Sequence, residues 1–171
     1  GQTRIYSSIN NENDIKIIKI EQQIEYTNEQ IFGVIRNIKN YNNIISNSSL
    51  HSKLIQTYND TLWGYQLVKN SIPFTRDRQY VFKMYKLSQN KLVWIIDEQF
   101  KNLNQTSSED IRDLKVGAGI WEITNKNNKR YLINKIYVDD KVNIPGLFVD
   151  RLRRKHVYQI FKDVLNTVNN N

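Results

Sequence analysis

The chain has 171 residues, of which 39% are hydrophobic, and a formal net charge of +8. This length and composition indicate one domain, spanning 1–171, with a core of its own. The lack of cysteine excludes disulfides, thiolate metal sites and cysteine nucleophiles, and no apolar run approaches the ~20 residues of a membrane-spanning helix. The positive charge favours acidic partners, either anionic lipid surfaces or nucleic acid.

The N-terminal quarter of the chain predicts two strands followed by two short helices. Apolar residues alternate imperfectly over Arg4–Ser8 and Asp14–Tyr26, which is typical of an antiparallel pair of strands. Thr27 with Gln30 three residues later forms a capping box, which marks the start of a helix. A second short helix is expected at Tyr41–Ile45.

From Leu50 onward the pattern changes to strands. Alternating apolar residues predict strands at Ser52–Tyr58, Leu62–Val68, Arg78–Leu87, Leu92–Glu98, Ile111–Thr124 and Tyr131–Val138. Turns are expected at Asn59-Asp60 and Asn125–Asn128, and a long polar loop at Phe100–Asp110. This order of elements is an α+β layout rather than a βαβ one, and no glycine-rich phosphate motif is present, so we do not expect a Rossmann or P-loop site.

The last predicted element is an amphipathic helix from Pro145 to about Val168. Its apolar residues cover roughly 200° of its circumference; they are Val149, Leu152, Val157, Ile160, Phe161, Val164, Leu165 and Val168. An arc that wide cannot be buried by one flat contact. We therefore expect a curved antiparallel sheet that closes around this helix.

Three short motifs resemble the START domain, the lipid-transfer branch of the helix-grip superfamily (birch-pollen-allergen-like, SRPBCC). In chain order they are Ile72-Pro73-Phe74 with Arg76-Asp77, then Arg112 with Gly119 and Trp121, then Asp139 with Ile144-Pro145. The resemblance implies a helix-grip fold, with two short helices after the second strand. It also implies an internal apolar cavity between sheet and C-terminal helix that binds one lipid or other hydrophobic small molecule, for transfer or sequestration, without a cofactor.

The residues expected to line this cavity come from the predicted strands and the last helix. They are Trp63, Tyr80, Phe82, Met84, Trp94, Ile96, Arg112, Val149, Leu152, Arg153, His156 and Ile160. In this fold the aromatic core and the cavity wall are the same surface.

Three polar residues of this set allow two interpretations each. A charged side chain within a strand needs either solvent or a partner, so Arg112 either faces the cavity beside Asp97 or Glu98 or lies on the outer surface. Arg153 either meets a lipid head group or, as we favour, pairs within its own helix or reaches solvent. For His156 a place in the core is favoured over a hydrogen bond to a ligand.

Several function classes remain after this reading. The expected protein is a monomeric, non-enzymatic carrier whose basic residues Arg151, Arg153, Arg154 and Lys155 approach an anionic membrane transiently. These cations spread around the helix and no RNA- or DNA-binding motif accompanies them, which argues against nucleic acid. The alternatives are a polyketide cyclase- or aromatase-like enzyme of the same superfamily, or a protein-interaction module with a vestigial cavity.

Two further expectations concern metals and location. The two histidines, His51 and His156, have no HxxxH or HExxH spacing, so no metal site is expected. The sequence begins Gly1-Gln2 without methionine, which indicates either a removed leader or a remnant of expression. A periplasmic or secreted location is therefore favoured over the cytoplasm.

Overall fold

The computed structural model describes 3–10, 15–46, 49–69, 76–100, 108–139 and 146–170, with side chains except at 8–10, 15, 138, 146–150 and 152. Some sequence expectations lie outside these residues. They are Ile72-Pro73-Phe74, Ile144-Pro145 and 101–107 of the expected long loop.

The described strands form one sheet in the order β1-β2-β9-β8-β6-β5-β4-β3, and β7 pairs with β5. Their bounds are β1 (Arg4–Asn10), β2 (Ile15–Ile24), β3 (Leu50–Tyr58), β4 (Thr61–Val68), β5 (Asp77–Ser88), β6 (Lys91–Ile96), β7 (Ile111–Asp113), β8 (Gly117–Lys126) and β9 (Lys129–Val138). Neighbouring strands are antiparallel except β7, which is parallel to β5. The helices are α1 (Asn28–Arg36), η1 (Ile38–Asn40), α2 (Tyr41–Ile44), η2 (Glu98–Phe100) and α4 (Gly146–Asn170).

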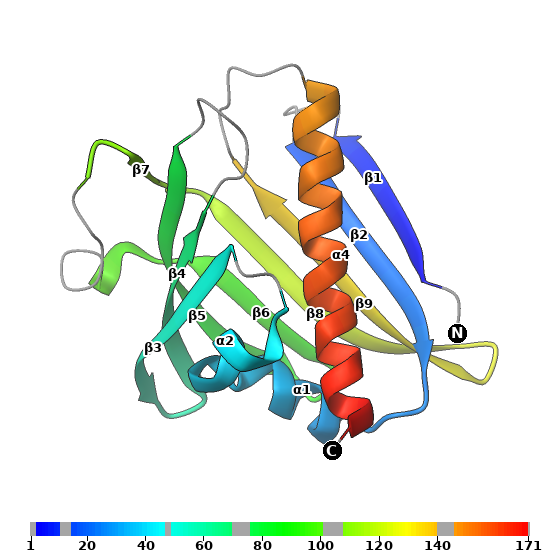
Figure 1. The fold of residues 1–171 in the computed structure, drawn as a ribbon. Helices are drawn as coiled ribbons and strands as arrows, with labels where there is room; N and C mark the ends of the chain where they lie inside the picture. Colours follow the sequence, from blue (N-terminus) through cyan, green and yellow to red (C-terminus); the bar gives the residue numbers. More distant parts are fainter. Residues whose placement is uncertain are drawn as a thin grey trace.

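The sheet curves around α4, as Figure 1 shows, and the expected α+β helix-grip fold is confirmed. In that view α1 and α2 lie at the lower end of the sheet, beside the C-terminal half of α4, and α4 begins at the upper end. We use "lower end" and "upper end" in this sense below, and "inner face" for the side of the sheet that α4 covers.

Local signals in the sequence set several of these elements. The capping box of α1 is present: the backbone N–H of Gln30 donates to Oγ1 of Thr27, and the backbone N–H of Thr27 donates to Oε1 of Gln30. The turn between β8 and β9 has positive φ at both Asn127 (50°) and Asn128 (60°), which matches the twist of a two-residue hairpin. Asparagine tolerates this backbone region, so the predicted turns are confirmed.

The prediction of one strand over Ile111–Thr124 is wrong. The segment forms two strands, because β7 continues the sheet beside the start of β5, whereas β8 pairs with β6 and β9. Between them the backbone N–H of Leu114 donates to the carbonyl of Gln79 at 2.9 Å, and the Leu114 side chain is buried. The chain must stop pairing with β5 before it can pair with β6.

The lower half of the inner face is closely packed. The ring of Phe161 on α4 stacks on Trp121 of β8, with centroids 5.7 Å apart and planes 11° apart. Around this pair the fully buried side chains come from α1, from the sheet and from α4; they include Ile20, Ile31, Ile35, Leu92, Leu132 and Val164. This apolar contact fixes the C-terminal half of α4 against the sheet and α1.

A polar contact at the lower end holds the same half of the helix. Asp163 of α4 is only 5% exposed, and its carboxylate accepts hydrogen bonds from the backbone N–H of Ser46 at 2.8 Å and from the Ser46 hydroxyl at 2.9 Å. The amide of Gln159 also donates to it at 3.0 Å. The segment that follows α2 is thereby tied to α4.

The first prediction concerns this contact. Asp163→Ala should lower the free energy of unfolding by about 2 kcal/mol, because it removes the charged acceptor of the hydrogen bonds from Ser46 and Gln159. Asn166→Ala, an exposed neighbour on the same helix, should change it by less than about 0.5 kcal/mol. Urea unfolding followed by circular dichroism measures both; equal stability of the two variants would contradict the anchoring role of Asp163.

Candidate functional site

The inner face of the sheet is defined by alternate residues of its strands. On β5 these are Tyr80, Phe82 and Met84, and on β6 they are Leu92, Trp94 and Ile96. Met84 of β5 and Trp94 of β6 are cross-strand partners and lie directly opposite each other. Such residues point to one side of a pleated sheet, so they form a continuous apolar surface beneath α4.

Burial on this face decreases from the lower to the upper end. Along β6 the exposed fraction rises from 0% at Leu92 to 9% at Trp94, and Ile96 is half-buried. The same order holds on β9, where Leu132 is fully buried and Ile136 is half-buried. The helix therefore seals the lower half of the interior and covers the upper half incompletely, although the side chains there are still apolar.

Two glycines make room for aromatic rings on the inner face of the sheet. A Cβ on Gly119 would lie 2.2 Å from Nε1 of Trp94, and one on Gly64 would lie 2.6 Å from the ring of Phe82. Each ring therefore occupies the space in front of a glycine on the neighbouring strand. The two rings meet edge-on, with centroids 6.2 Å apart and planes 74° apart, so a side chain at either glycine would displace a ring of this cluster.

A row of hydrogen-bonded polar groups crosses the inner face near the upper end. The hydroxyl of Tyr80 donates to Oε1 of Gln66, and Nε2 of Gln66 donates to the hydroxyl of Ser52 at 3.1 Å. Burial raises the pKa of Tyr80 well above its usual range, so the hydroxyl stays protonated as a donor. These groups give the apolar interior a neutral polar strip.

The structure brings most of the predicted lining residues together. Phe82, Met84 and Trp94 are buried on the inner face, and Tyr80 and Ile96 are half-buried there; Tyr80 stacks on Trp94 with centroids 6.2 Å apart. On α4, Ile160 is half-buried against the same core. Val149 and Leu152 lie in α4, but their side chains fall outside those described.

Trp63 is placed wrongly by the sequence prediction. Its indole Nε1 donates to Oδ2 of Asp97 at 3.2 Å, and its ring meets Phe100 edge-on at 5.6 Å. Lys83, its cross-strand partner, also pairs with Asp97. These contacts lie on the outer face, because Leu62 and Gly64 on either side of Trp63 point inwards.

The polar candidates lie at or near the upper end. Arg112 is exposed, beside its cross-strand neighbour Arg78 at the start of β5, so it belongs to the rim of the interior rather than to its wall. Arg153 and His156 are half-buried on α4. Burial lowers the pKa of His156, which keeps its imidazole neutral at pH 7.

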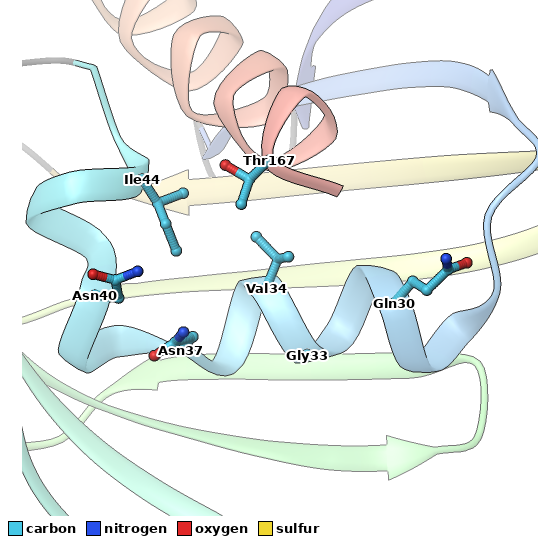
Figure 2. A pocket seen from close by; sticks show the side chains of 7 residues that line it. All are labelled: Gln30, Gly33, Val34, Asn37, Asn40, Ile44 and Thr167. Atoms are coloured by element: carbon cyan, nitrogen blue, oxygen red, sulfur yellow. The ribbon is translucent and has the colours of Figure 1, made fainter. Parts of the chain in front are cut away.

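A separate groove lies outside the sheet at the lower end, between α1, α2 and the end of α4 (Figure 2). It encloses about 340 Å³ and is lined by Gln30, Gly33, Val34, Asn37, Asn40, Ile44 and Thr167. None of these belongs to the predicted cavity residues.

The described part of the chain holds neither a cluster of metal ligands nor a helix suited to cross a membrane. No group of three or more His, Asp or Glu side chains there is arranged to hold a metal ion. No helix there combines the length and the apolar character that a bilayer crossing requires.

One inner-face residue was missed by the sequence reading. Asn134 of β9 lies between its cross-strand partners Ile20 and Trp121 and is 0% exposed. Neither Oδ1 nor Nδ2 of its amide has a hydrogen-bond partner. The alternation Leu132, Asn134, Ile136 could have indicated an inward-facing amide, because it puts asparagine in step with two apolar residues.

Comparison with known proteins identifies the fold. No family model and no curated sequence matches the chain. Among solved structures, a STAR-related lipid transfer protein from Xanthomonas axonopodis has a TM-score of 0.77 at 9% identity, covering 98% of this chain and 93% of that one. Human STARD10 has a TM-score of 0.71 at 13% identity, covering 96% and 70%. The di-domain ARO/CYC protein StfQ of the steffimycin biosynthetic pathway has a TM-score of 0.60 at 9% identity, covering 89% and 49%.

The chain thus has the helix-grip fold of the STAR-related lipid transfer proteins. The resemblance read from the sequence motifs is confirmed at the level of the fold. The neighbours include both lipid transfer proteins and an ARO/CYC protein, so they do not decide between these functions.

The second prediction tests the glycine beneath Trp94. Gly119→Ala should lower the free energy of unfolding by about 1–3 kcal/mol, because the added methyl displaces the indole from the sheet. The control is Gly33→Ala in α1, where a Cβ meets nothing within 4 Å and a gain of about 0.5–1 kcal/mol is expected. Denaturant titration and tryptophan emission report both; unchanged stability and emission in the Gly119 variant would contradict the packing described.

Proposed function

We propose that this protein binds one lipid or similar hydrophobic molecule between the inner face of the sheet and α4, and carries or sequesters it without changing it chemically. The observation that carries the proposal is the uneven burial of the inner face. Apolar and aromatic side chains of the upper half remain incompletely covered by the helix, and an apolar ligand is a suitable occupant of that space.

The energy available for such binding is adequate. A ligand that buries ~300 Å² of apolar surface gains roughly 7 kcal/mol before the costs of association are subtracted. The inner-face side chains that stay half-buried at the upper end, Tyr80, Ile96 and Ile136, support the proposal, because a ligand would contact them first. Burial of these side chains by a ligand stabilises the complex in the way that core packing stabilises the lower half.

The alternative is an enzyme of the same superfamily that acts on a polyketide. Such an enzyme needs an acid or base that reaches the ligand, and His156 is the described residue best suited to that role, since its lowered pKa leaves the imidazole neutral. Tyr80 is less suitable, because its hydroxyl is protonated and donates to Gln66. We favour the carrier, and the same experiment addresses both functions.

The third prediction concerns the bound molecule. Native mass spectrometry of protein purified without detergent should show one apolar molecule per chain, and organic extraction should recover it. Prolonged incubation of the loaded protein should leave the molecule chemically unchanged, and His156→Gln should not alter that result. A chain that binds no apolar molecule from a lipid mixture would contradict the proposal, and time-dependent conversion that His156→Gln abolishes would favour the enzyme.

The charges around the upper end suit an anionic surface. The exposed cations there are Lys69, Arg76, Arg112, Lys115, Arg151, Arg154 and Lys155, whereas Glu109 and Asp110 are the exposed carboxylates described beside β7. Val116, directly before β8, is an apolar side chain that is 50% exposed at this end. A membrane would therefore meet cations and an apolar contact at the same end as the incompletely covered interior.

The fourth prediction tests that approach. Arg154→Glu with Lys155→Glu should weaken binding to vesicles that contain phosphatidylserine, by about 1 kcal/mol for each cation removed. Lys86→Glu with Lys129→Glu, an equal charge change at exposed positions away from the upper end, should leave binding unaltered. Vesicle co-sedimentation at two salt concentrations measures this difference; equal loss in both double variants would indicate a general charge effect instead.

A further inference from the structure

We infer that Asn134 hydrogen-bonds a neutral polar group on the bound molecule, one that both donates and accepts, such as a hydroxyl or an amide. This inference rests on the proposed function and names the class of ligand. It starts from a buried amide for which the surrounding protein provides no partner.

Asn134 lies at the depth that the inner end of a bound molecule would reach. Along β9 the inward-facing residues are Leu132, Asn134 and Ile136, and Asn134 is the last of them that is fully buried before the half-buried Ile136. Its partner across the sheet, Trp121, lies beneath Phe161 of α4. Asn134 thus stands at the boundary between the closely packed lower half and the incompletely covered upper half.

The amide specifies what the ligand must carry. Oδ1 accepts and Nδ2 donates, and both are unpaired, so a group that only accepts would leave Oδ1 unsatisfied. A hydroxyl or a secondary amide satisfies both atoms. Buried polar groups in folded proteins are nearly always hydrogen-bonded, so an unpaired amide in an apolar interior needs an explanation of this kind.

The surroundings indicate that the ligand group is neutral. The inner-face residues next to Asn134 along and across the strands are Ile20, Trp121, Leu132 and Ile136, all without charge. A carboxylate or phosphate placed among them would be desolvated without a compensating cation. The basic residues of the upper end are better placed for a membrane surface than for the deep end of a ligand.

A contrast with Gln66 makes the inference testable without any ligand. Gln66 is also a buried inner-face amide, but it is hydrogen-bonded to Tyr80 and Ser52. Asn134→Leu removes an unpaired amide and should raise the melting temperature of the delipidated protein by about 2–4 °C. Gln66→Leu leaves the Tyr80 and Ser52 hydroxyls without their hydrogen-bond partner and should lower the melting temperature by a similar amount.

Binding is tested with three fluorescent probes that share a pyrene ring. These are 1-pyrenebutanol, 1-butylpyrene and 1-pyrenebutyrate, which end in a hydroxyl, a methyl and a carboxylate. The wild-type protein should bind the alcohol about tenfold more tightly than the hydrocarbon, and the carboxylate most weakly. Asn134→Leu should lose this preference for the alcohol, because leucine offers neither a donor nor an acceptor. In ¹⁵N-labelled protein the side-chain NH₂ signals that Asn134→Leu removes should shift with the alcohol.

The outcomes separate the two proposals. If the probes bind but both proteins treat alcohol and hydrocarbon alike, or if Asn134→Leu lowers the melting temperature, the inference about Asn134 is overturned and the proposed binding function stands. Stabilised Asn134→Leu protein without any change in probe preference would mean that the amide is buried unpaired and does not contact the ligand, which also overturns the inference. If no pyrene probe binds and no apolar molecule is extracted, the proposed function fails and the inference fails with it.

Discussion

The attachment of α4 through its C-terminal half is the interaction on which the rest of the structure depends. Phe161 stacks on Trp121, and Asp163 binds the segment after α2 through Ser46. These contacts let one helix close the lower end of a sheet that is too wide for it to fill. The upper half then retains an apolar surface that the helix covers incompletely, and the proposed binding function follows from this difference between the halves.

Much of the fold could be predicted because short-range rules determine it. The capping box of Thr27 and Gln30, the asparagine turns and the wide apolar arc of the last helix each reflect local chemistry, and together they gave the α+β helix-grip architecture. The break between β7 and β8 was not predictable in this way. It arises because successive parts of one segment pair with two different strands, first with β5 and then with β6.

The candidate site was predicted less completely, for reasons of strand geometry. Leu62, Trp63 and Gly64 are consecutive and uncharged, so alternation alone does not tell which of them faces inwards, and the structure puts Trp63 outside. The role of Gly64 and Gly119 depends on the neighbouring strand, which a single sequence does not reveal. Asn134 was not predicted as a site residue, because an asparagine does not indicate a site until its burial is known.

The continuity of α4 has a mechanical consequence. The helix contains 25 residues and is therefore about 37 Å long. Its first residue lies roughly 22 Å from Phe161, so a rigid rotation of about 10° about that contact would displace the start of the helix by roughly 4 Å. A tilt of this size separates the upper end of the helix from the strands while every hydrogen bond within it is kept. Entry of a molecule into the proposed site would then require no unwinding of the backbone, but the same rotation would move Asn170, about 14 Å beyond Phe161, by roughly 2 Å.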